Sequence, residues 1–209
     1  IVVGLEATTP AGAEAARGLA ATLGAPVLLT YMAKGVVPDD SPHFAGIFTG
    51  GAIEQACVRA ADLIVLAGLD PVELIRKPWP YSAPVVELAA ATYSPHYVQP
   101  AVRVTGDLAQ ILKHLTANLA GGDWRVSDIA GHRQAFLDGM AMPDGAGLSA
   151  GAVVRAAVDA FGPSSRLTVD AGAHMFSACA LWQAAAPLDL LISNGLASMG
   201  FALPAAIAA

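Results

Sequence analysis

Residues 1–30 read IVVGLEATTPAGAEAARGLAATLGAPVLLT, and this stretch decides the fold class. Ile1–Leu5 is a β-branched apolar run typical of a buried strand, and Ala25–Thr30 is a second run of this kind. Between them, Pro10 precedes a series of small and apolar residues that ends at Gly24, which predicts a helix. Strand, helix and strand in this order indicate a βαβ unit, whose strands are parallel.

The same alternation of strands and helices continues along the chain. Residues 32–51 are punctuated by Gly, Pro and Asp and predict a long loop. Further strands are predicted at 63–67, 85–88, near Val102, 166–171 and 188–193, and further helices at 52–61, 107–119, 127–140 with Ser127 as N-cap, 150–162 and 174–183. The predicted fold is therefore α/β: a parallel-sheet, Rossmann-like central domain, a linker, and the first part of a second parallel α/β domain.

This pattern divides the chain into three parts. Residues 1–120 form a central, nucleotide-binding-like domain, 121–149 a connector with a turn at Pro143-Asp144-Gly145, and 150–209 an incomplete second domain. The chain begins inside a strand and stops inside the apolar run SNGLASMGFALPAAIAA, residues 193–209. We therefore expect a fragment that is cut at both ends, and an oligomer that covers the bare apolar surface.

Composition excludes several classes of protein. Hydrophobic residues make up 55% and charged residues 13%, and the net charge of −6 comes with scattered Lys and Arg, so we expect no nucleic-acid partner. No stretch approaches the roughly eighteen apolar residues of a membrane helix, and no signal peptide is present, which favours a cytoplasmic protein with no membrane contact. Cys57 and Cys179 stand in apolar contexts and are predicted to be buried thiols.

Two turns carry the pattern of a ligand site. In open parallel sheets, ligands bind beyond the carboxyl ends of the strands. The strand at 166–171 leads into Gly172-Ala173-His174, and the strand at 188–193 leads into the segment 195–199, Gly-Leu-Ala-Ser-Met. Small residues let a ligand approach the backbone, and helices that follow would point free N–H groups at an anion. The turns predict a diphosphate cradle, although Gly and Ser after a strand are also ordinary turn residues.

These segments resemble a known family. VDAGAHMF (169–176) and SNGLASMGFALPAAIAA (193–209) are similar to the opening of the diphosphate-binding domain of thiamine-diphosphate-dependent enzymes of the acetolactate synthase type. GAPVLLTYMAKGVVPDDSPHFAGIFTGG (24–51) and ADLIVLAGLDP (61–71) resemble the central domain of the same family. The resemblance covers nearly the whole chain, and the long second motif is its most specific part.

The resemblance implies a set of cofactor-binding residues. Met199 would be the bulky residue that holds the thiamine diphosphate bent, a role that suits an apolar and adaptable thioether. Two positions depart from the family pattern, because Ala173 stands in place of a Gln and Ala197 in place of a common Gly. The residues implied to bind the cofactor are Gly172, Ala173, His174, Gly195, Ala197, Ser198 and Met199.

The resemblance also implies an activity for the complete protein. It would be a carboligase or decarboxylase that acts on small 2-oxo acids, as a homodimer or homotetramer. The family's Mg²⁺ ligands and its activating glutamate would lie outside this sequence, so we expect no catalytic residue and no metal ligand in it. A chain of these residues alone would be inactive.

Other interpretations stay open. The first turn, GLEATTP (4–10), lacks the G-x-G-x-x-G pattern, so FAD in the central domain is neither excluded nor supported, and a nicotinamide-dependent oxidoreductase is disfavoured. A non-catalytic nucleotide-binding or structural α/β domain is the main alternative function. Asp70, Glu73 and Glu87 follow strands and are interpreted as surface or turn carboxylates.

Overall fold

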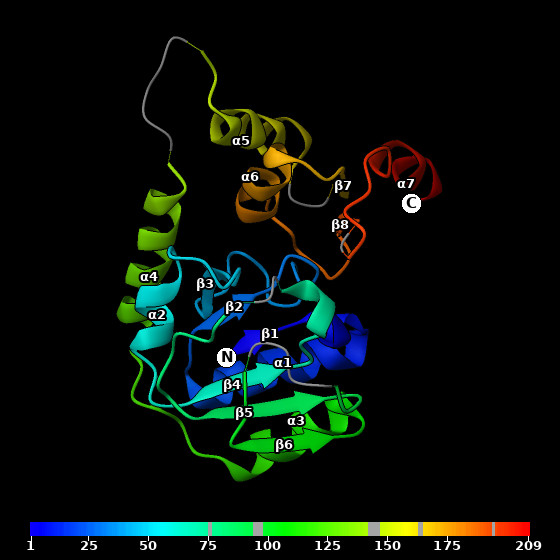
Figure 1. Ribbon diagram of the computed structural model, residues 1–209. Helices are drawn as coiled ribbons and strands as arrows, with labels where there is room; N and C mark the ends of the chain where they lie inside the picture. Colours follow the sequence, from blue (N-terminus) through cyan, green and yellow to red (C-terminus); the bar gives the residue numbers. More distant parts are fainter. Residues whose placement is uncertain (75–76, 94–97, 142–146, 163–164, 194) are drawn as a thin grey trace.

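Six short parallel strands form the larger of two sheets, in the order β3-β2-β1-β4-β5-β6 (Figure 1). This computed structural model describes the chain apart from residues 75–76, 94–97, 142–146, 163–164 and 194. The strands are β1 (Val2–Val3), β2 (Val27–Leu29), β3 (Phe44–Ile47), β4 (Ile64–Ala67), β5 (Val85–Ala89) and β6 (Val102–Thr105). This is the strand order of the Rossmann fold, and it confirms the predicted α/β class.

Helices cover both faces of this sheet, and neighbouring residues of each strand point to opposite faces. Val3 and Leu29 belong to the apolar cluster under α1 (Pro10–Leu23) and α3 (Leu108–Asn118), which pack against each other. Val2 and Leu28 belong to a second cluster with residues of α2 (Gln55–Arg59) and with Ile129 of α4 (Val126–Gly139). Burial of both faces explains the near-continuous apolar runs in the sequence.

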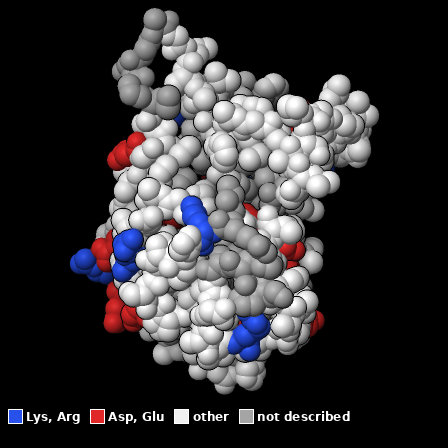
Figure 2. Space-filling view, viewed as in Figure 1, with Lys and Arg blue, Asp and Glu red and all other residues white. Residues whose placement is uncertain are grey.

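A second, two-stranded parallel sheet lies beside the first at the other end of the chain (Figure 1). Its elements are α5 (Ala150–Phe161), β7 (Leu167–Val169), α6 (Ala173–Leu181), β8 (Leu190–Ile192) and α7 (Ala202–Ala208). A third apolar cluster fills this part, with Cys179 fully buried and Trp182 only 3% exposed. Figure 2 shows few charged side chains over α6 and α7, in keeping with the low charge content of the sequence.

The loop between β2 and β3 joins the two sheets. Lys34 is completely buried, and its Nζ lies 2.6 Å from Oδ1 of Asp39. The other oxygen of Asp39 accepts a hydrogen bond from the backbone N–H of Ala184, at 3.2 Å. Tyr31, in the same loop, packs its ring against Phe176 of α6. A hydrogen bond from Ala184 to the ion-paired Asp39 and an aromatic contact therefore connect the first sheet to the second.

Both cysteines are free thiols, as predicted. Cys57 and Cys179 are buried and do not form a disulfide. Burial raises the pKa of the Cys57 thiol to about 11 and that of Cys179 to about 12. Both side chains therefore stay protonated at neutral pH and behave as small apolar residues.

Three of the predicted elements are wrong in detail. The segment 32–51 was expected to be a loop throughout, but it contains β3, which pairs with β2 and closes one edge of the sheet. The helix expected at 52–61 is reduced to α2, which spans only Gln55–Arg59. Ser127 is not an N-cap, because α4 begins one residue earlier and its N-cap is Arg125. The predicted turn at Pro143–Gly145 lies outside the described residues.

None of the helices in the described part of the chain is long and apolar enough to cross a membrane.

Candidate functional site

The two predicted turns leave the second sheet at the same edge. β7 and β8 are parallel neighbours, and Val169 at the end of β7 pairs with Ile192 at the end of β8. The segments that follow, with Gly172 after β7 and Gly195 after β8, therefore start side by side. The structure thus brings together the starts of the two turns that were predicted to form one cradle.

Gly172 opens α6 without a side-chain cap. It is the N-cap residue, its φ is 155°, and no side chain accepts a hydrogen bond from the first turn of the helix. A methyl group at this position would lie 2.8 Å from Cε1 and 2.9 Å from Nδ1 of His174, so the imidazole folds back over the glycine. Uncapped N–H groups at a helix start suit an anion, and the glycine permits the imidazole to lie this close to the backbone.

The second turn is strained at one residue. Gly195 has a φ of 83°, which glycine adopts freely, but Ala197 has a φ of 48°, which is unfavourable for a residue with a Cβ. The N–H of Ser198 donates to Oγ of Ser193 at 3.1 Å and holds the turn closed. Met199 follows with 86% of its surface exposed. The methyl of Ala197, where the family commonly has glycine, therefore sits in a backbone conformation that favours glycine.

Asp170 connects the end of β7 to the start of α7. This contact was not among the predictions from the sequence. Its Oδ1 accepts a hydrogen bond of 2.6 Å from the backbone N–H of Ala202. This bond, together with weaker contributions from the N–H groups of Gly200 and Phe201 and from His174, lowers the pKa of the carboxyl group. The sequence could have indicated this role, because Asp170 stands directly after a strand and two residues before a glycine. Its partner, Ala202, lies 32 residues further on.

A hollow of about 510 Å³ opens beside these elements. Asp170, His174 and Ala202 line it together with apolar residues of α5 and β7. Trp182 also lines it, and its buried indole N–H has no hydrogen-bond partner in the described part of the chain. Of the predicted site residues, only His174 reaches this hollow.

The predicted residues share one property, which is exposure. His174 lies on the first turn and Met199 on the second, and both side chains are exposed. The five small residues of the predicted set are exposed as well. The full set is Gly172, Ala173, His174, Gly195, Ala197, Ser198 and Met199. A ligand can therefore reach every one of them from outside this chain.

Among the residues that the structure describes, no group of three or more His, Cys, Asp or Glu side chains could hold a metal ion.

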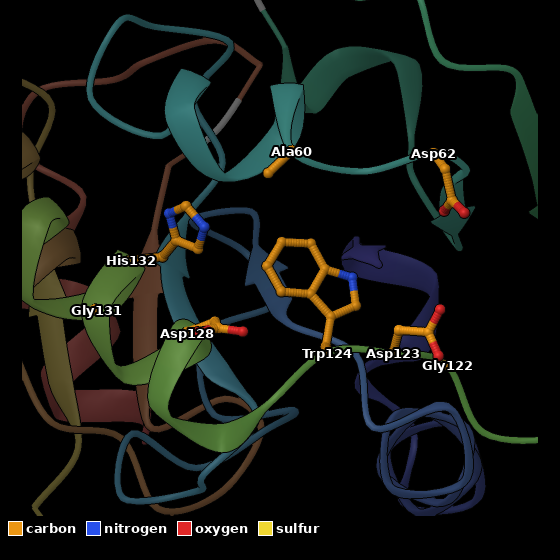
Figure 3. A pocket seen from close by; sticks show the side chains of 8 residues that line it. All are labelled: Ala60, Asp62, Gly122, Asp123, Trp124, Asp128, Gly131 and His132. Atoms are coloured by element: carbon orange, nitrogen blue, oxygen red, sulfur yellow. The ribbon is translucent and has the colours of Figure 1, made fainter.

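A larger hollow, of about 780 Å³, lies elsewhere on the molecule, between α2 and α4. Trp124 stands at its centre with His132 on one side and Asp62 on the other (Figure 3). The rings of Trp124 and His132 meet edge to face at 5.6 Å, and Asp128 is paired with Arg125. None of the lining residues belongs to the two predicted turns, so this hollow is a separate surface feature.

Two carboxylates that the sequence predicted at surface or turn positions are held by other parts of the chain, and Glu87 is buried while Glu73 is half-buried. Glu87 in β5 is 6% exposed and forms an ion pair with Arg103, its neighbour across the pairing of β5 and β6. Glu73 ends the short helix η2 (Pro71–Glu73) and receives hydrogen bonds from three different parts of the chain. Leu5 and Thr30 lie far from Glu73 in sequence, whereas Asp70 and Glu73 form a local capping box three residues apart.

The part of the chain that forms the larger sheet identifies the family. A model of the thiamine pyrophosphate enzyme central domain matches residues 1–115, which include all six strands of the larger sheet. The chain belongs to the thiamine pyrophosphate enzyme family. The resemblance noted in the sequence is therefore confirmed, and the family implies thiamine diphosphate (thiamine pyrophosphate) as cofactor.

Curated relatives of this thiamine pyrophosphate family member are acetolactate synthases. The enzyme of Bacillus subtilis (strain 168) is 26% identical over 225 residues, covering 100% of the chain and 39% of the relative. The enzyme of Mycobacterium bovis is 25% identical over 211 residues, and that of Mycobacterium leprae 27% over 212, each covering 94% of the chain and 34% of the relative. The chain thus spans little more than a third of the length of these relatives.

The residues of the first turn fit the diphosphate of this cofactor. The start of α6 offers uncapped N–H groups, and the imidazole of His174 lies beside them, over Gly172. The second turn, in which Gly195 and Ala197 have positive φ angles, follows the neighbouring strand β8.

Proposed function

We propose that the protein carrying this chain is a thiamine-diphosphate-dependent enzyme that acts on 2-oxo acids, as an acetolactate synthase-like carboligase or a decarboxylase. The observation that carries the proposal is the parallel pairing of β7 and β8, which starts both predicted turns at one edge. Membership of the thiamine pyrophosphate enzyme family and the acetolactate synthase relatives support it. In this role the chain supplies a central domain and one wall of the cofactor pocket.

Each turn has a different task in this proposal. The N–H groups at the start of α6, around Gly172 and Ala173, bind the diphosphate, and His174 lies beside it. Backbone groups of Gly195, Ala197 and Ser198 line the second side of the pocket, where the absence of large side chains permits close approach. Ala173 offers no polar side chain where the family has a Gln, so its contribution is limited to the backbone.

Met199 has the third task. Its exposed thioether is placed to pack against the middle of the cofactor and to hold it bent. The chemistry that thiamine diphosphate supplies when bound is a carbanion nucleophile for the carbonyl carbon of the 2-oxo acid. The residues of this chain then bind and orient the cofactor, and Met199 excludes water from one side of it.

Mg²⁺, the assembly and the domain boundaries are further parts of the proposal. Mg²⁺ would clamp the diphosphate through ligands outside this sequence, and the protein would be a homodimer or homotetramer in the cytoplasm. The exposed apolar side chains Leu196, Met199, Leu203 and Ile207 support an oligomer, because such a group of side chains is stabilised by burial. The free cysteines agree with a reducing compartment.

The boundaries that we propose are 1–120 for the central domain, 121–149 for the connector and 150–209 for the cofactor-binding part.

A binding titration tests this function. The full-length protein is titrated calorimetrically with thiamine diphosphate in the presence of Mg²⁺, and carbon dioxide release from pyruvate is measured in parallel. We expect saturable binding, weakened more than about tenfold by Met199→Asp, because a carboxylate would face the anionic cofactor across an apolar contact. Met199→Leu, which keeps volume and polarity, should bind almost as the wild type does.

Two outcomes would contradict the proposal. Binding by Met199→Asp that equals the wild type would remove Met199 from the cofactor pocket. An absence of binding heat in the wild-type protein would favour a non-catalytic nucleotide-binding or structural domain instead.

A further inference from the structure

The crevice of the larger sheet lies between β1 and β4, where the strand order changes direction. In sheets of this order, a nucleotide places its diphosphate against the turn after β1 and the start of the first helix. The free N–H groups of that turn are the donors that an anion needs. Whether these N–H groups are free or already hydrogen-bonded within the chain therefore decides whether this crevice can hold a nucleotide.

A carboxylate of the chain itself fills this position. Oε2 of Glu73 accepts the backbone N–H of Leu5, in the turn after β1, and that of Asp70, in the turn after β4, each at 2.9 Å. Oε1 of Glu73 accepts the hydroxyl of Thr30, at the end of β2. A methyl group on Gly4 would lie 2.7 Å from Oε2 of Glu73, so the carboxylate is packed directly against the first turn. One anion thus joins the ends of three neighbouring strands.

The start of α1 has few donors that could replace these N–H groups. Pro10 opens the helix and has no N–H. The N–H of Gly12 donates to Oγ1 of Thr9 at 3.1 Å, and the N–H of Ala13 donates to the carbonyl of Thr9 at 2.8 Å. Pro10, Gly12 and Ala13 therefore offer no free donor with which this helix could bind a phosphate.

A second carboxylate closes the neighbouring strand end. Oε2 of Glu6 accepts the N–H of Ala90 after β5, and Oε1 accepts the hydroxyl of Tyr93, both at 2.7 Å. A methyl group on Gly68 would lie 3.0 Å from Cβ of Glu6 and 2.6 Å from Leu108, so the space between β1 and β4 is filled. Across the described residues, no Lys or Arg forms an ion pair with Glu6 or Glu73.

The charge at this edge opposes a further anion. Burial raises the pKa of the Glu73 carboxyl, and the hydrogen bonds from Leu5, Thr30 and Asp70 work against that rise. A phosphate placed beside this carboxylate would add repulsion, and none of the ion pairs among the described residues neutralises Glu73. Both the filled space and the negative charge of Glu73 therefore oppose the binding of a nucleotide in this crevice.

We propose that Glu73 is a built-in anion at the diphosphate position of this crevice, and that it closes the central domain to FAD, ADP and nicotinamide dinucleotides. The sequence had left FAD in this domain neither excluded nor supported. The closure is independent of the thiamine diphosphate site, which lies on the second sheet.

The first experiment asks for bound nucleotide directly. The protein is purified without added cofactor and denatured, the supernatant is examined for flavin fluorescence, and the native protein is titrated calorimetrically with FAD, ADP and NADH. We expect no released flavin and no saturable heat with any of the three. Stoichiometric flavin, or saturable binding of one of these ligands, would overturn the proposal whether or not thiamine diphosphate binds.

The second experiment removes the carboxylate. We expect Glu73→Ala to lower the melting temperature, and acetate or inorganic phosphate to recover part of the loss relative to chloride at equal ionic strength. Glu14→Ala is the matched control, because Glu14 lies exposed on α1; neither it nor the wild type should respond specifically to these anions. An unchanged melting temperature, or recovery equal to that of the control, would contradict the proposal.

A third variant covers the case in which Glu73→Ala does not fold. Glu73→Gln keeps the volume of the side chain but has only one acceptor oxygen for three donors. We expect it to melt below the wild type without recovery by acetate, since its amide still fills the space. A melting temperature equal to that of the wild type would mean that the carboxylate does not hold these donors.

Discussion

At the scale of single residues, glycines show where two segments approach most closely. Gly35, in the loop between β2 and β3, has a φ of 86°, and a methyl group on it would lie 2.0 Å from the carbonyl oxygen of Ala186. That oxygen belongs to the backbone of the second sheet's part of the chain, so it cannot move aside as a side chain could. Position 35 therefore tolerates glycine alone.

Two Gly→Ala substitutions test this point. We expect Gly35→Ala to lower the free energy of unfolding by more than about 3 kcal/mol, because both the φ angle and the carbonyl oppose a Cβ. Gly18→Ala should raise the free energy of unfolding by roughly 0.5–1 kcal/mol, because Gly18 lies within α1 and a methyl there meets nothing within 4 Å. Chemical denaturation measures both. Equal effects of the two substitutions would show that the close contact at Gly35 is absent.

At the scale of elements, the first turn of α7 depends on one carboxylate. Asp170 receives the N–H of Ala202, and its pKa lies below the ordinary value of 3.8. Because folding lowers this pKa, the stabilisation is present above pH 3.8 and is lost as the pH falls through the lower value found in the folded protein.

Hydrogen exchange tests this cap on α7. We expect the amide of Ala202 to be protected at neutral pH and to lose protection, relative to other α7 amides, when Asp170 is protonated or replaced in Asp170→Asn. Asp159→Asn is a suitable control, since Asp159 lies exposed on α5. Protection of Ala202 that is the same in the wild type and in Asp170→Asn would refute the capping role.

Elements with strong local signals could be predicted from the sequence. The first helix ends at Gly24, whose φ of 61° is the left-handed conformation that the position requires, and the buried strands β2 and β4 lie within their predicted ranges. β3 was missed because FAGI has no alternation and contains Gly46, and only packing against Phe136 shows why a glycine belongs there. Ser127 was a reasonable N-cap by residue type, but an Arg125–Asp128 ion pair accompanies an earlier helix start.

The candidate site could be predicted only in part, for a similar reason. The two turns were found because motif and strand ends are local in sequence, and their parallel pairing follows the expected rule. The roles of Asp170 and Glu73 were missed, since the donor to Asp170 and two of the three donors to Glu73 lie in segments that only the fold brings near. Long-range hydrogen bonds of this kind leave no periodic trace in a sequence.

At the scale of the whole molecule, one member of a buried ion pair, Asp39, connects the two sheets. Asp39 accepts from both Lys34 and the backbone of Ala184, and the side chain of Lys34 is 0% exposed. Lys34 also lies over the ring of Phe44, 5.1 Å from its centroid. A buried lysine without its partner is strongly unfavourable, so this contact should control how firmly the second sheet is held.

Removal of Asp39 tests this connection. We expect Asp39→Ala to reduce the free energy of unfolding by about 3–5 kcal/mol and to speed proteolysis within residues 150–209, since Lys34 would be left buried and unpaired. Asp40→Ala is the matched control, because Asp40 is adjacent and exposed. Similar proteolysis of the two variants would show that the sheets are held by their apolar contacts alone.

The carboxylate of Glu73 differs from a diffusible ligand in being tethered to the chain. It stands three residues from one of its donors, Asp70, so its effective concentration at the crevice is fixed by covalent linkage and not by the composition of the cell. Proteins that bind a nucleotide in such a crevice gain stability in proportion to the logarithm of the nucleotide concentration. This sheet should instead keep the same stability in cells that are starved of riboflavin or adenylate and in cells that are replete with them.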